Sequence, residues 1–171
     1  ISSSEVGQRI AQHQNVITAA QQAGVKRIVY TSLLKADTTH LGLGPEHLAT
    51  EESIKASGLE YTILRNGWYT ENYTANLAGT VQAGTLIGSA GEGKIASASR
   101  HDFAEAAAAV LTSEGHTNKT YELAGDEAYT LADLAQVLSQ QVGKEIPYVN
   151  LPEQEYSAAI ESFGVPKMYA D

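Results

Sequence analysis

The sequence predicts an α/β fold built on a parallel β-sheet, and three observations support that prediction. Amphipathic helical segments alternate with short apolar segments that are rich in β-branched residues. A glycine separates a helix from the strand that follows it at Gly24 and again at Gly58. The apolar segments are nearly continuous, as expected for strands that are buried on both faces. Helix, glycine and buried strand in repeated order is the pattern of parallel strands joined by right-handed crossovers.

Two such units open the chain. The apolar residues of segment 5–23 recur close to a 3.6-residue spacing, and Gly24 stands where a C-cap glycine belongs. Segment 25–32 follows as a short, mostly buried strand, because it combines β-branched residues with a tyrosine. The second unit has a helix near 45–56 and a strand at 59–64. The sequence therefore predicts neighbouring parallel strands.

The two ends of the sequence predict that it is a piece of a longer domain. Ile1 is typical of the last residue of an apolar strand, and three serines follow it as a polar strand-to-helix turn. Glu5 is placed to favour the positive end of the next helix. The body of that strand is absent, and the segment 165–171 has no recognisable cap. We therefore expect both ends to be cut.

The remaining sequence continues the alternation. The run 103–111 is rich in Ala, which has the highest helix propensity. Thr130, with Asp133 three residues later, is a capping pair for the next helix. The expected helices are 72–82, 103–111 and 130–142, and the expected strands are 84–87, 94–98, 120–123 and 146–149.

Composition narrows the classes of function. The chain has 171 residues, of which 43% are hydrophobic, and this suffices for one folded domain with a core. Eleven basic residues against 20 acidic ones leave a net charge of −9, which disfavours nucleic acid and anionic membranes as partners. The absence of Cys excludes disulfides, thiolate nucleophiles and Cys-ligated zinc. No segment approaches the roughly 18 apolar residues of a membrane helix, so we expect a cytoplasmic protein.

Open parallel sheets bind ligands at the carboxyl ends of their strands. Three segments follow predicted strands, at 2–4, 31–34 and 65–72. The third places a cation, two amides, two aromatic rings and a glycine directly behind a buried strand, which exceeds what a connecting turn requires. The alternative interpretation of Trp68 and Tyr69 is a pair of half-buried anchors for the next helix.

Segments 25–32 and 57–73 resemble the NmrA-like branch of the atypical short-chain dehydrogenases, and in particular its NADPH-dependent quinone reductases. The run Tyr-Thr-Ile-Leu-Arg-Asn-Gly-Trp-Tyr at 61–69 is the most specific part of a resemblance that covers nearly the whole chain. It implies an α/β, Rossmann-like NAD(P)-binding parallel sheet that is incomplete at its N-terminus. Residues 1–78 would form the C-terminal half of that domain, and residues 79–171 a smaller α/β substrate-binding region interleaved with the same fold.

The resemblance also implies where the cofactor NADP(H) would bind. One group of residues would line the turn beside the cofactor, where an ordinary helix N-cap is the alternative: Ser2, Ser3 and Ser4. A second group would form the loop over the nicotinamide: Asn66, Gly67, Trp68, Tyr69, Thr70 and Glu71. Arg100 would face the cofactor or substrate, although an Arg before a helix is otherwise usually a surface residue. The glycine-rich turn that holds the pyrophosphate is absent from the sequence, and segment 88–93 is interpreted as a flexible hairpin.

Typical short-chain dehydrogenases use a Tyr and a Lys four residues later, and the Lys lowers the pKa of the Tyr. Aligning Glu51 with the acidic residue that follows this Lys puts His47 at the Lys position and Leu43 at the Tyr position. Without the usual acid, ketone chemistry is disfavoured, whereas a quinone accepts a hydride with little acid assistance. The resemblance therefore predicts hydride transfer to a quinone without flavin.

The candidate catalytic residues are His47 and Tyr69. His47 would supply a proton at neutral pH, and its alternative is an ordinary residue of a helix face. Tyr69 would donate a proton or, as we prefer, offer a stacking surface for a planar quinone. A second class of function stays open, in which the fold binds NAD(P) without turnover and acts as a redox sensor.

No metal site is predicted. The histidines at 13, 40, 101 and 116 show no ligand spacing with a carboxylate that is typical of a metal site. The pair His101 and Asp102 opens a helix, where an Asp is expected for capping alone.

Overall fold

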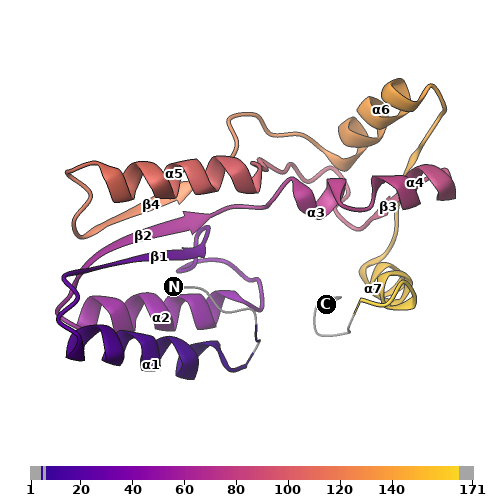
Figure 1. The fold of residues 1–171 in the computed structure, drawn as a ribbon. Coiled ribbons are helices and arrows are strands. Elements are labelled where there is room, and N and C mark those ends of the chain that lie inside the picture. The colour runs from indigo at the N-terminus through magenta and orange to yellow at the C-terminus, as the bar shows by residue number, and fades with distance from the viewer. Residues whose placement is uncertain (1–4, 6, 166–171) are drawn as a thin grey trace. The chain divides into compact units, whose positions relative to one another are not determined.

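The structure is a computed structural model that describes residue 5 and residues 7–165. Its described residues form two compact units that alternate along the chain. The first unit takes the described residues up to Thr70 together with Ser97–Gly125, and the second takes Glu71–Ala96 together with the described residues from Asp126 onward. Each unit is treated by itself, and Figure 1 labels the elements of both.

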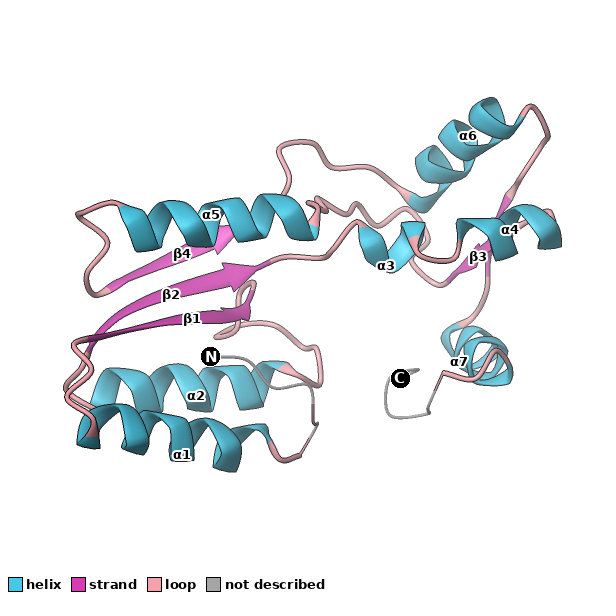
Figure 2. Ribbon diagram, in the orientation of Figure 1, coloured by secondary structure: helices cyan, strands magenta, loops and turns pink. Residues whose placement is uncertain are grey.

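The first unit is a parallel sheet with helices on both of its faces. Its strands lie in the order β1-β2-β4, and both neighbouring pairs are parallel. Helices α1 and α2 cover one face, and α5 covers the other (Figures 1 and 2). The elements are α1 (Arg9–Gln22), β1 (Arg27–Leu33), α2 (Gly44–Ala56), β2 (Glu60–Asn66), α5 (Arg100–Thr112) and β4 (Lys119–Leu123). The predicted parallel α/β fold is confirmed.

An apolar cluster holds α1 and α2 against this sheet. Ile17 from α1 and Ile54 from α2 meet side chains of the first two strands, including the fully buried Tyr30. In β2, every residue from Thr62 to Asn66 is buried. A run without alternation is what two covered faces require, and here it includes the polar Thr62, Arg65 and Asn66 beside two apolar residues.

The strand register places the last two residues of β2 in two different rows. Arg65 pairs with Ser32 of β1 and with Glu122 of β4. Asn66 pairs with Leu33 and Leu123, one residue further along each strand. Successive side chains of a strand point to opposite faces of the sheet, so the two rows face opposite helical layers.

The second unit is built on a short parallel pair, β3 (Leu86–Gly88) and β5 (Tyr148–Asn150). Helix α6 (Leu131–Val142) packs on both strands. A Cβ added at Gly88 would lie 2.6 Å from Cδ1 of Leu131, so a side chain there would require the Leu131 side chain to shift. The unit is completed by α3 (Glu71–Thr74), α4 (Leu77–Ala83) and α7 (Glu153–Ser162).

Two predicted elements differ from those observed. The helix expected over 72–82 is divided into α3 and α4, and Asn76 is the N-cap residue between them. Asn disfavours helix interiors because its side chain competes for backbone hydrogen bonds. The strand expected over 94–98 forms only isolated bridges, Ile95 with Tyr129 and Ala98 with Tyr69. Its two ends pair with different partners, so no continuous ladder forms.

Several local predictions are confirmed. Thr130 and Asp133 form a reciprocal capping box at the start of α6. Gly24 follows α1 with a φ of +69°, the left-handed conformation expected of a glycine just past a helix end. Helix α7 was not predicted, although Pro152 before it and Glu153 in its first turn are favourable start signals. Within the described residues, no helix is both long and apolar enough to cross a membrane.

Candidate functional site

The carboxyl end of β2 carries a buried amide that is only partly satisfied. Asn66, the last residue of β2, is 5% exposed, and its Nδ2 lies 3.5 Å from the hydroxyl oxygen of Tyr69. Its Oδ1 is buried and has no hydrogen-bond partner among the described residues. Buried polar atoms are almost always hydrogen-bonded in folded proteins, and an unpaired acceptor is unfavourable. Asn66 therefore offers an acceptor to a donor that approaches the strand end.

Gly67 lets the ends of β2 and β4 come close together. Its backbone N–H donates to the carbonyl oxygen of Leu123 at 2.8 Å. A Cβ at Gly67 would lie only 3.0 Å from that same oxygen. A side chain at this position would push the two backbones apart, so the glycine is required by the packing. Trp68 follows directly, and it is 45% exposed.

Tyr69 is held between a ring and a cation from α5. Its ring makes an edge-on contact with Phe103, with centroids 5.3 Å apart and an interplanar angle of 67°. The guanidinium carbon of Arg100 lies 5.3 Å from the centroid of the same ring, within the range of a cation–π contact. Both partners are on α5, so this helix fixes the orientation of Tyr69.

The loop after β2 is also held through its backbone. Thr70 N–H donates to the carbonyl oxygen of Ala98 at 2.9 Å, and Ala98 N–H donates to that of Trp68 at 3.2 Å. The hydroxyl oxygens of Thr70 and Ser97 lie 2.9 Å apart. Segment 66–70 is therefore an ordered loop, and its exposed indole projects from a fixed backbone.

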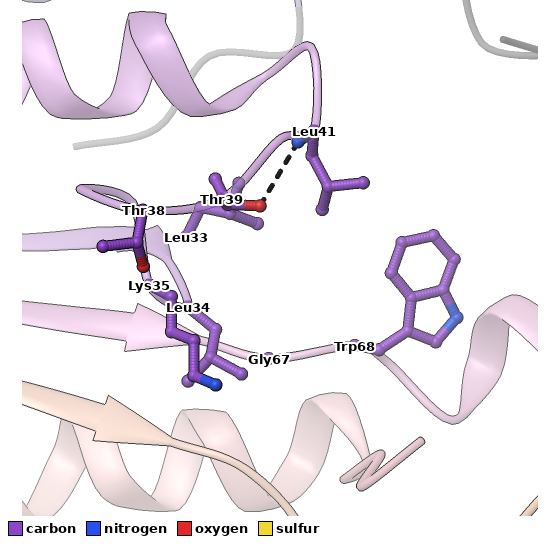
Figure 3. Close-up of a pocket in the computed structure, with 8 residues that line it drawn as sticks. All are labelled: Leu33, Leu34, Lys35, Thr38, Thr39, Leu41, Gly67 and Trp68. Atoms are coloured by element: carbon purple, nitrogen blue, oxygen red, sulfur yellow. Dashed lines mark hydrogen bonds between the residues drawn. The ribbon is translucent and has the colours of Figure 1, made fainter. Parts of the chain in front are cut away.

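A pocket of about 250 Å³ opens beside this loop. One side is the turn after β1, and the other is the backbone of Gly67 with the indole of Trp68 (Figure 3). Most of the lining is hydrocarbon, which suits a flat apolar ligand with few polar groups. The lining residues are Leu33, Leu34, Lys35, Thr38, Thr39, Leu41, Gly67 and Trp68.

Arg65 is the centre of an ion-pair network on the other face of the sheet. Its Nε and Nη2 donate to the two carboxylate oxygens of Glu51 at 2.9 and 2.7 Å. Its Nη1 lies 2.7 Å from Oε1 of Glu122 and 3.1 Å from Oδ1 of Asp37. Glu51 is fully buried and also accepts from the hydroxyl of Ser32 at 2.6 Å. The network therefore joins β2 to α2, to β4 and to the turn after β1.

Burial and hydrogen bonding act in opposite directions on the pKa of Glu51. Burial favours the neutral acid, but the hydrogen bonds from Arg65 and Ser32 outweigh it and hold the pKa below its ordinary value. Hydrogen bonding to Glu51 in turn raises the pKa of Arg65 above its already high value. The pair is therefore charged at neutral pH, and all three nitrogens of the Arg65 guanidinium contact a carboxylate.

His47 lies deeper in the first unit, on α2. Its Nδ1 is 2.7 Å from the hydroxyl oxygen of Tyr30. Burial, followed by the charge of nearby Arg9 and the neighbouring His13, lowers the pKa of His47 to about 4. Burial also raises the pKa of Tyr30 to about 12. At neutral pH both groups are uncharged, so His47 carries no extra proton to donate.

The structure brings together only some of the predicted site residues. Asn66, Tyr69 and Arg100 form one cluster, and Gly67 and Trp68 line the adjoining pocket. Thr70 binds Ser97 at the base of the loop. The remaining predicted residues are placed otherwise: His47 pairs with Tyr30, Glu71 begins α3 in the second unit, and Ser2, Ser3 and Ser4 lie outside the described residues.

Sequence reasoning missed three parts of this site. Phe103 supports Tyr69, and its signal was a bulky residue three positions after Arg100 in an otherwise Ala-rich helix. The predicted segment 31–34 supplies Leu33 and Leu34 to the pocket, but the rest of this wall, at 35–41, has no motif that predicts its shape. Glu122 joins the Arg65 network through cross-strand pairing, which no local pattern reports.

Segment 88–93 does not offer free backbone donors to a phosphate at two of its positions. Ala90 N–H donates to the hydroxyl of Tyr148 at 3.2 Å, and Gly91 N–H donates to Oδ1 of Asn150 at 2.7 Å. The segment connects β3 to the bridge at Ile95 instead of opening a helix. The predicted hairpin is not formed, because β3 pairs in parallel with β5 and Ile95 bridges to Tyr129, so the two sides of the segment do not pair with each other.

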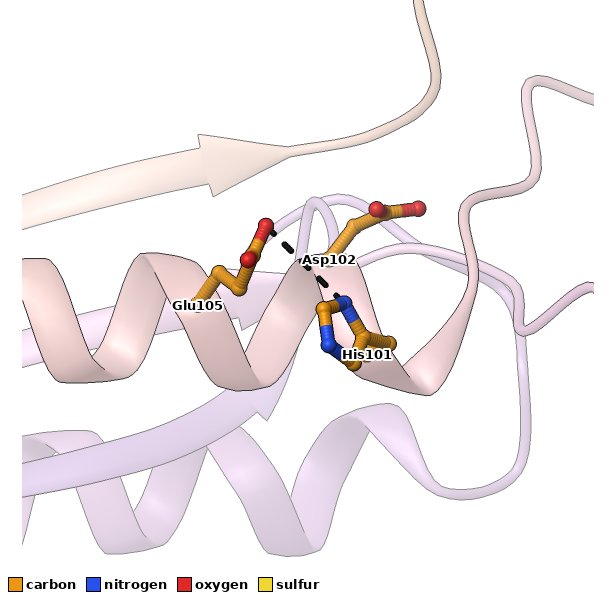
Figure 4. A group of neighbouring side chains, drawn as sticks. All are labelled: His101, Asp102 and Glu105. Carbon is orange, nitrogen blue, oxygen red and sulfur yellow. Dashed lines mark ion pairs between the residues drawn. The ribbon is translucent and has the colours of Figure 1, made fainter.

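Three exposed side chains at the start of α5, those of His101, Asp102 and Glu105, lie close together (Figure 4). His101 Nδ1 is 3.9 Å from Oε2 of Glu105, a contact between residues one helical turn apart. Asp102 already accepts from the backbone N–H and the hydroxyl of Ser99 in a capping box. Capping and helical spacing account for the whole group, so it provides no independent indication of a metal.

Comparison with known proteins gives a consistent relationship. The family model described as NAD(P)H-binding matches residues 2–114. Quinone oxidoreductase 2 of Escherichia coli (strain K12) is 57% identical over 171 residues, which is 100% of this chain and 60% of that protein. The predicted resemblance, made from segments 25–32 and 57–73, is confirmed.

Solved structures agree in fold. The crystal structure of an E. coli NADPH-dependent quinone oxidoreductase complexed with NADPH superposes with a TM-score of 0.95 at 56% identity, covering 99% of this chain and 60% of that one. The Citrobacter sp. triphenylmethane reductase complexed with NADP(H) gives 0.92 at 38% identity, with the same two shares. The predicted Rossmann-like fold is confirmed, and the chain spans about 60% of the length of the relatives it matches.

Proposed function

The chain belongs to the NAD(P)H-binding family, and from that premise we propose that the full-length protein is an NADPH-dependent quinone reductase that uses no flavin. The observation that carries this proposal is the end of β2. There, the unpaired buried oxygen of Asn66, the ring of Tyr69 and an apolar pocket lie on one ordered loop. Strand ends of this kind are where open α/β sheets bind nucleotides.

The residues after β2 fit the nicotinamide end of the cofactor. A carboxamide has two N–H donors, and Oδ1 of Asn66 is a buried acceptor that lacks one. The close approach at Gly67 leaves the backbone of this loop accessible to a ring. We propose that Gly67, Trp68 and Thr70 shape this end of the site, that Arg100 acts through Tyr69, and that Glu71 and Ser2 to Ser4 bind the cofactor as well.

The pocket beside the loop supports a quinone as the acceptor. A quinone is flat and largely apolar, and the pocket offers leucine side chains and an exposed indole. We propose that residues 79–171 form a smaller substrate-binding region and that residues 1–78 belong to the cofactor domain. The proposed location is the cytoplasm, where NADPH is available.

In the proposed reaction, bound NADPH supplies a hydride, and the quinone takes up this hydride and one proton to become a hydroquinone. The protein's contribution is to hold the two planar groups in contact and to exclude water. We propose that Tyr69 stacks on the quinone or donates a proton to it, and the contacts of its ring with Arg100 and Phe103 support this role. His47 is proposed as the second catalytic residue; with a pKa of about 4 it would act in its neutral form at neutral pH.

The direct test is steady-state oxidation of NADPH by the full-length protein, followed by loss of NADPH absorbance with benzoquinone as acceptor. The proposal predicts oxidation that depends on both the protein and the quinone. Tight NADPH binding without acceptor-dependent oxidation would contradict it, and would favour a non-catalytic redox sensor.

A further inference from the structure

We infer that Arg65 and Glu122 are positioning residues that set the shape of the acceptor pocket without lining it. They do so through the turn after β1, which forms one wall of that pocket. The inference rests on the proposed function, because it takes the pocket to be the place where the quinone binds. Neither residue is among those that line the pocket.

Glu122 connects the ion-pair network to the turn. Its Oε1 accepts from Nη1 of Arg65 at 2.7 Å, and its Oε2 accepts from the backbone N–H of Lys35 at 2.8 Å. Each carboxylate oxygen thus accepts a hydrogen bond from a different donor. Hydrogen bonds to charged groups are stronger than neutral ones, so both contacts are suited to fixing a backbone.

The backbone that Glu122 fixes is a strained one. Lys35 has a φ of +53°, in the left-handed region that residues with a Cβ rarely adopt. Its carbonyl oxygen accepts from the N–H groups of Thr38 and Thr39 at 2.9 and 2.8 Å. Both threonines line the pocket, so the conformation of Lys35 determines where this wall lies.

Arg65 fixes Glu122 because Arg65 itself is immobile. Its guanidinium is paired with the fully buried Glu51 through two hydrogen bonds, and it also reaches Asp37 within the same turn. The sequence of contacts therefore runs from a buried carboxylate through Arg65 and Glu122 to Lys35. Figure 3 shows Thr38 and Thr39 on the turn after β1, with the indole of Trp68 on the other side of the pocket.

Substitution of Glu122 tests this inference, because its side chain is 44% exposed and is not part of the core. In the full-length protein, Glu122→Ala removes both contacts. Glu122→Gln keeps an oxygen that can accept from Lys35. Glu60→Ala is the matched control, since Glu60 is an exposed Glu at the far end of β2.

For Glu122→Ala, we expect the KM for benzoquinone to rise about tenfold, as the loss of a charge-assisted contact implies, while kcat and the Kd for NADPH stay near wild type. Glu122→Gln should recover most of the KM, and Glu60→Ala should not change it. Acrylamide quenching of Trp68 fluorescence, with Trp68→Phe as the blank, should increase in Glu122→Ala without any substrate present.

An unchanged KM and unchanged quenching in Glu122→Ala would overturn the inference. So would a uniform loss of NADPH affinity, kcat and melting temperature, because that pattern indicates a structural role. If the wild-type protein does not oxidise NADPH with a quinone, the proposed function fails, but the quenching measurement still decides whether Glu122 positions the pocket wall.

Discussion

Two neighbouring residues at the end of β2 have opposite environments, and the difference indicates their roles. Arg65 is completely paired, with three carboxylates around one guanidinium. Asn66 faces the other side of the sheet and keeps a buried oxygen without a partner among the described residues. A satisfied buried ion pair supports a structural role for Arg65, and an unsatisfied buried acceptor at a strand end supports the proposed cofactor contact of Asn66. The structural role and the proposed binding role therefore fall on neighbouring residues of one strand.

At Tyr69 the ring, rather than the hydroxyl, is expected to matter. Tyr69→Phe keeps the contacts with Phe103 and Arg100, whereas Tyr69→Ala removes them. We expect quinone reduction by Tyr69→Phe within about twofold of wild type, and a loss of about tenfold in kcat/KM for Tyr69→Ala, consistent with the loss of an aromatic contact. A large loss in Tyr69→Phe, with a changed pH profile, would instead make the hydroxyl the proton donor.

His47 predicts how stability depends on pH. Its pKa is about 4 in the folded protein and about 6.5 when unfolded, so the unfolded chain binds the proton first as the pH falls. The stability contributed at neutral pH is therefore lost progressively from about pH 6.5 toward pH 4. Between pH 7 and pH 5, we expect a loss of about 1 to 2 kcal/mol from this residue.

Urea unfolding at the two pH values, in wild type and in His47→Asn, measures this contribution. Asn places an acceptor near the position of Nδ1 opposite Tyr30 but does not titrate. The variant should therefore lose less stability on acidification than the wild type. Equal losses in the two proteins would show that the pKa of His47 is not depressed by folding.

Among the contacts between elements, the ion pair of Arg65 with Glu51, which joins β2 to α2, is the most sensitive to substitution. Arg65→Met leaves the carboxylate of Glu51 buried without its principal partner, and we expect a destabilisation of about 3 to 5 kcal/mol. The double variant Arg65→Met with Glu51→Leu removes both charges and should recover much of that loss. Lys55→Met is the control, because its contact with Glu51 is 3.7 Å long and partly exposed. Stability is measured by chemical denaturation of the three variants. Equal stabilities would contradict the proposed importance of this ion pair.

The close approach of β2 and β4 gives a second prediction about elements. Gly67→Ala places a Cβ 3.0 Å from the carbonyl oxygen of Leu123, so one of the two backbones must shift. We expect a destabilisation of about 1 to 3 kcal/mol and weaker binding of the quinone acceptor. Gly42→Ala is the matched control, since nothing lies within 4 Å of its added Cβ and no left-handed φ is involved. Thermal unfolding measures both variants, and equal melting temperatures for Gly67→Ala and Gly42→Ala would contradict this prediction.

At the scale of the whole molecule, local sequence patterns predict the helices and strands well, but they do not predict pairing between segments that are distant in the sequence. Apolar periodicity and the glycine stops gave α1, β1, α2 and β2, because each depends on neighbours within a few residues. The segment 94–98 has strand composition but pairs with two different partners, so its isolated bridges could not be predicted. The break between α3 and α4 has a local cause in Asn76, which is the N-cap residue of α4 and disfavours a helix interior.

The candidate site divides in the same way. Residues 66–70 were predictable, since they follow a recognisable strand and carry the resemblance to a known family. Phe103 and Glu122 reach the site only through packing and cross-strand register, which no local pattern shows. The pairing of His47 with Tyr30 depends on tertiary packing, which the sequence does not show. Burial lowers the pKa of His47, and this opposes the role in proton donation that the sequence suggests.

The proposed position of the nicotinamide can be checked in a crystal structure of the full-length protein with NADPH bound. We expect the nicotinamide carboxamide to donate to Oδ1 of Asn66, and the ring to lie between the Gly67–Tyr69 loop and the apolar pocket. A nicotinamide bound away from the end of β2, with Asn66 still unpaired, would contradict it.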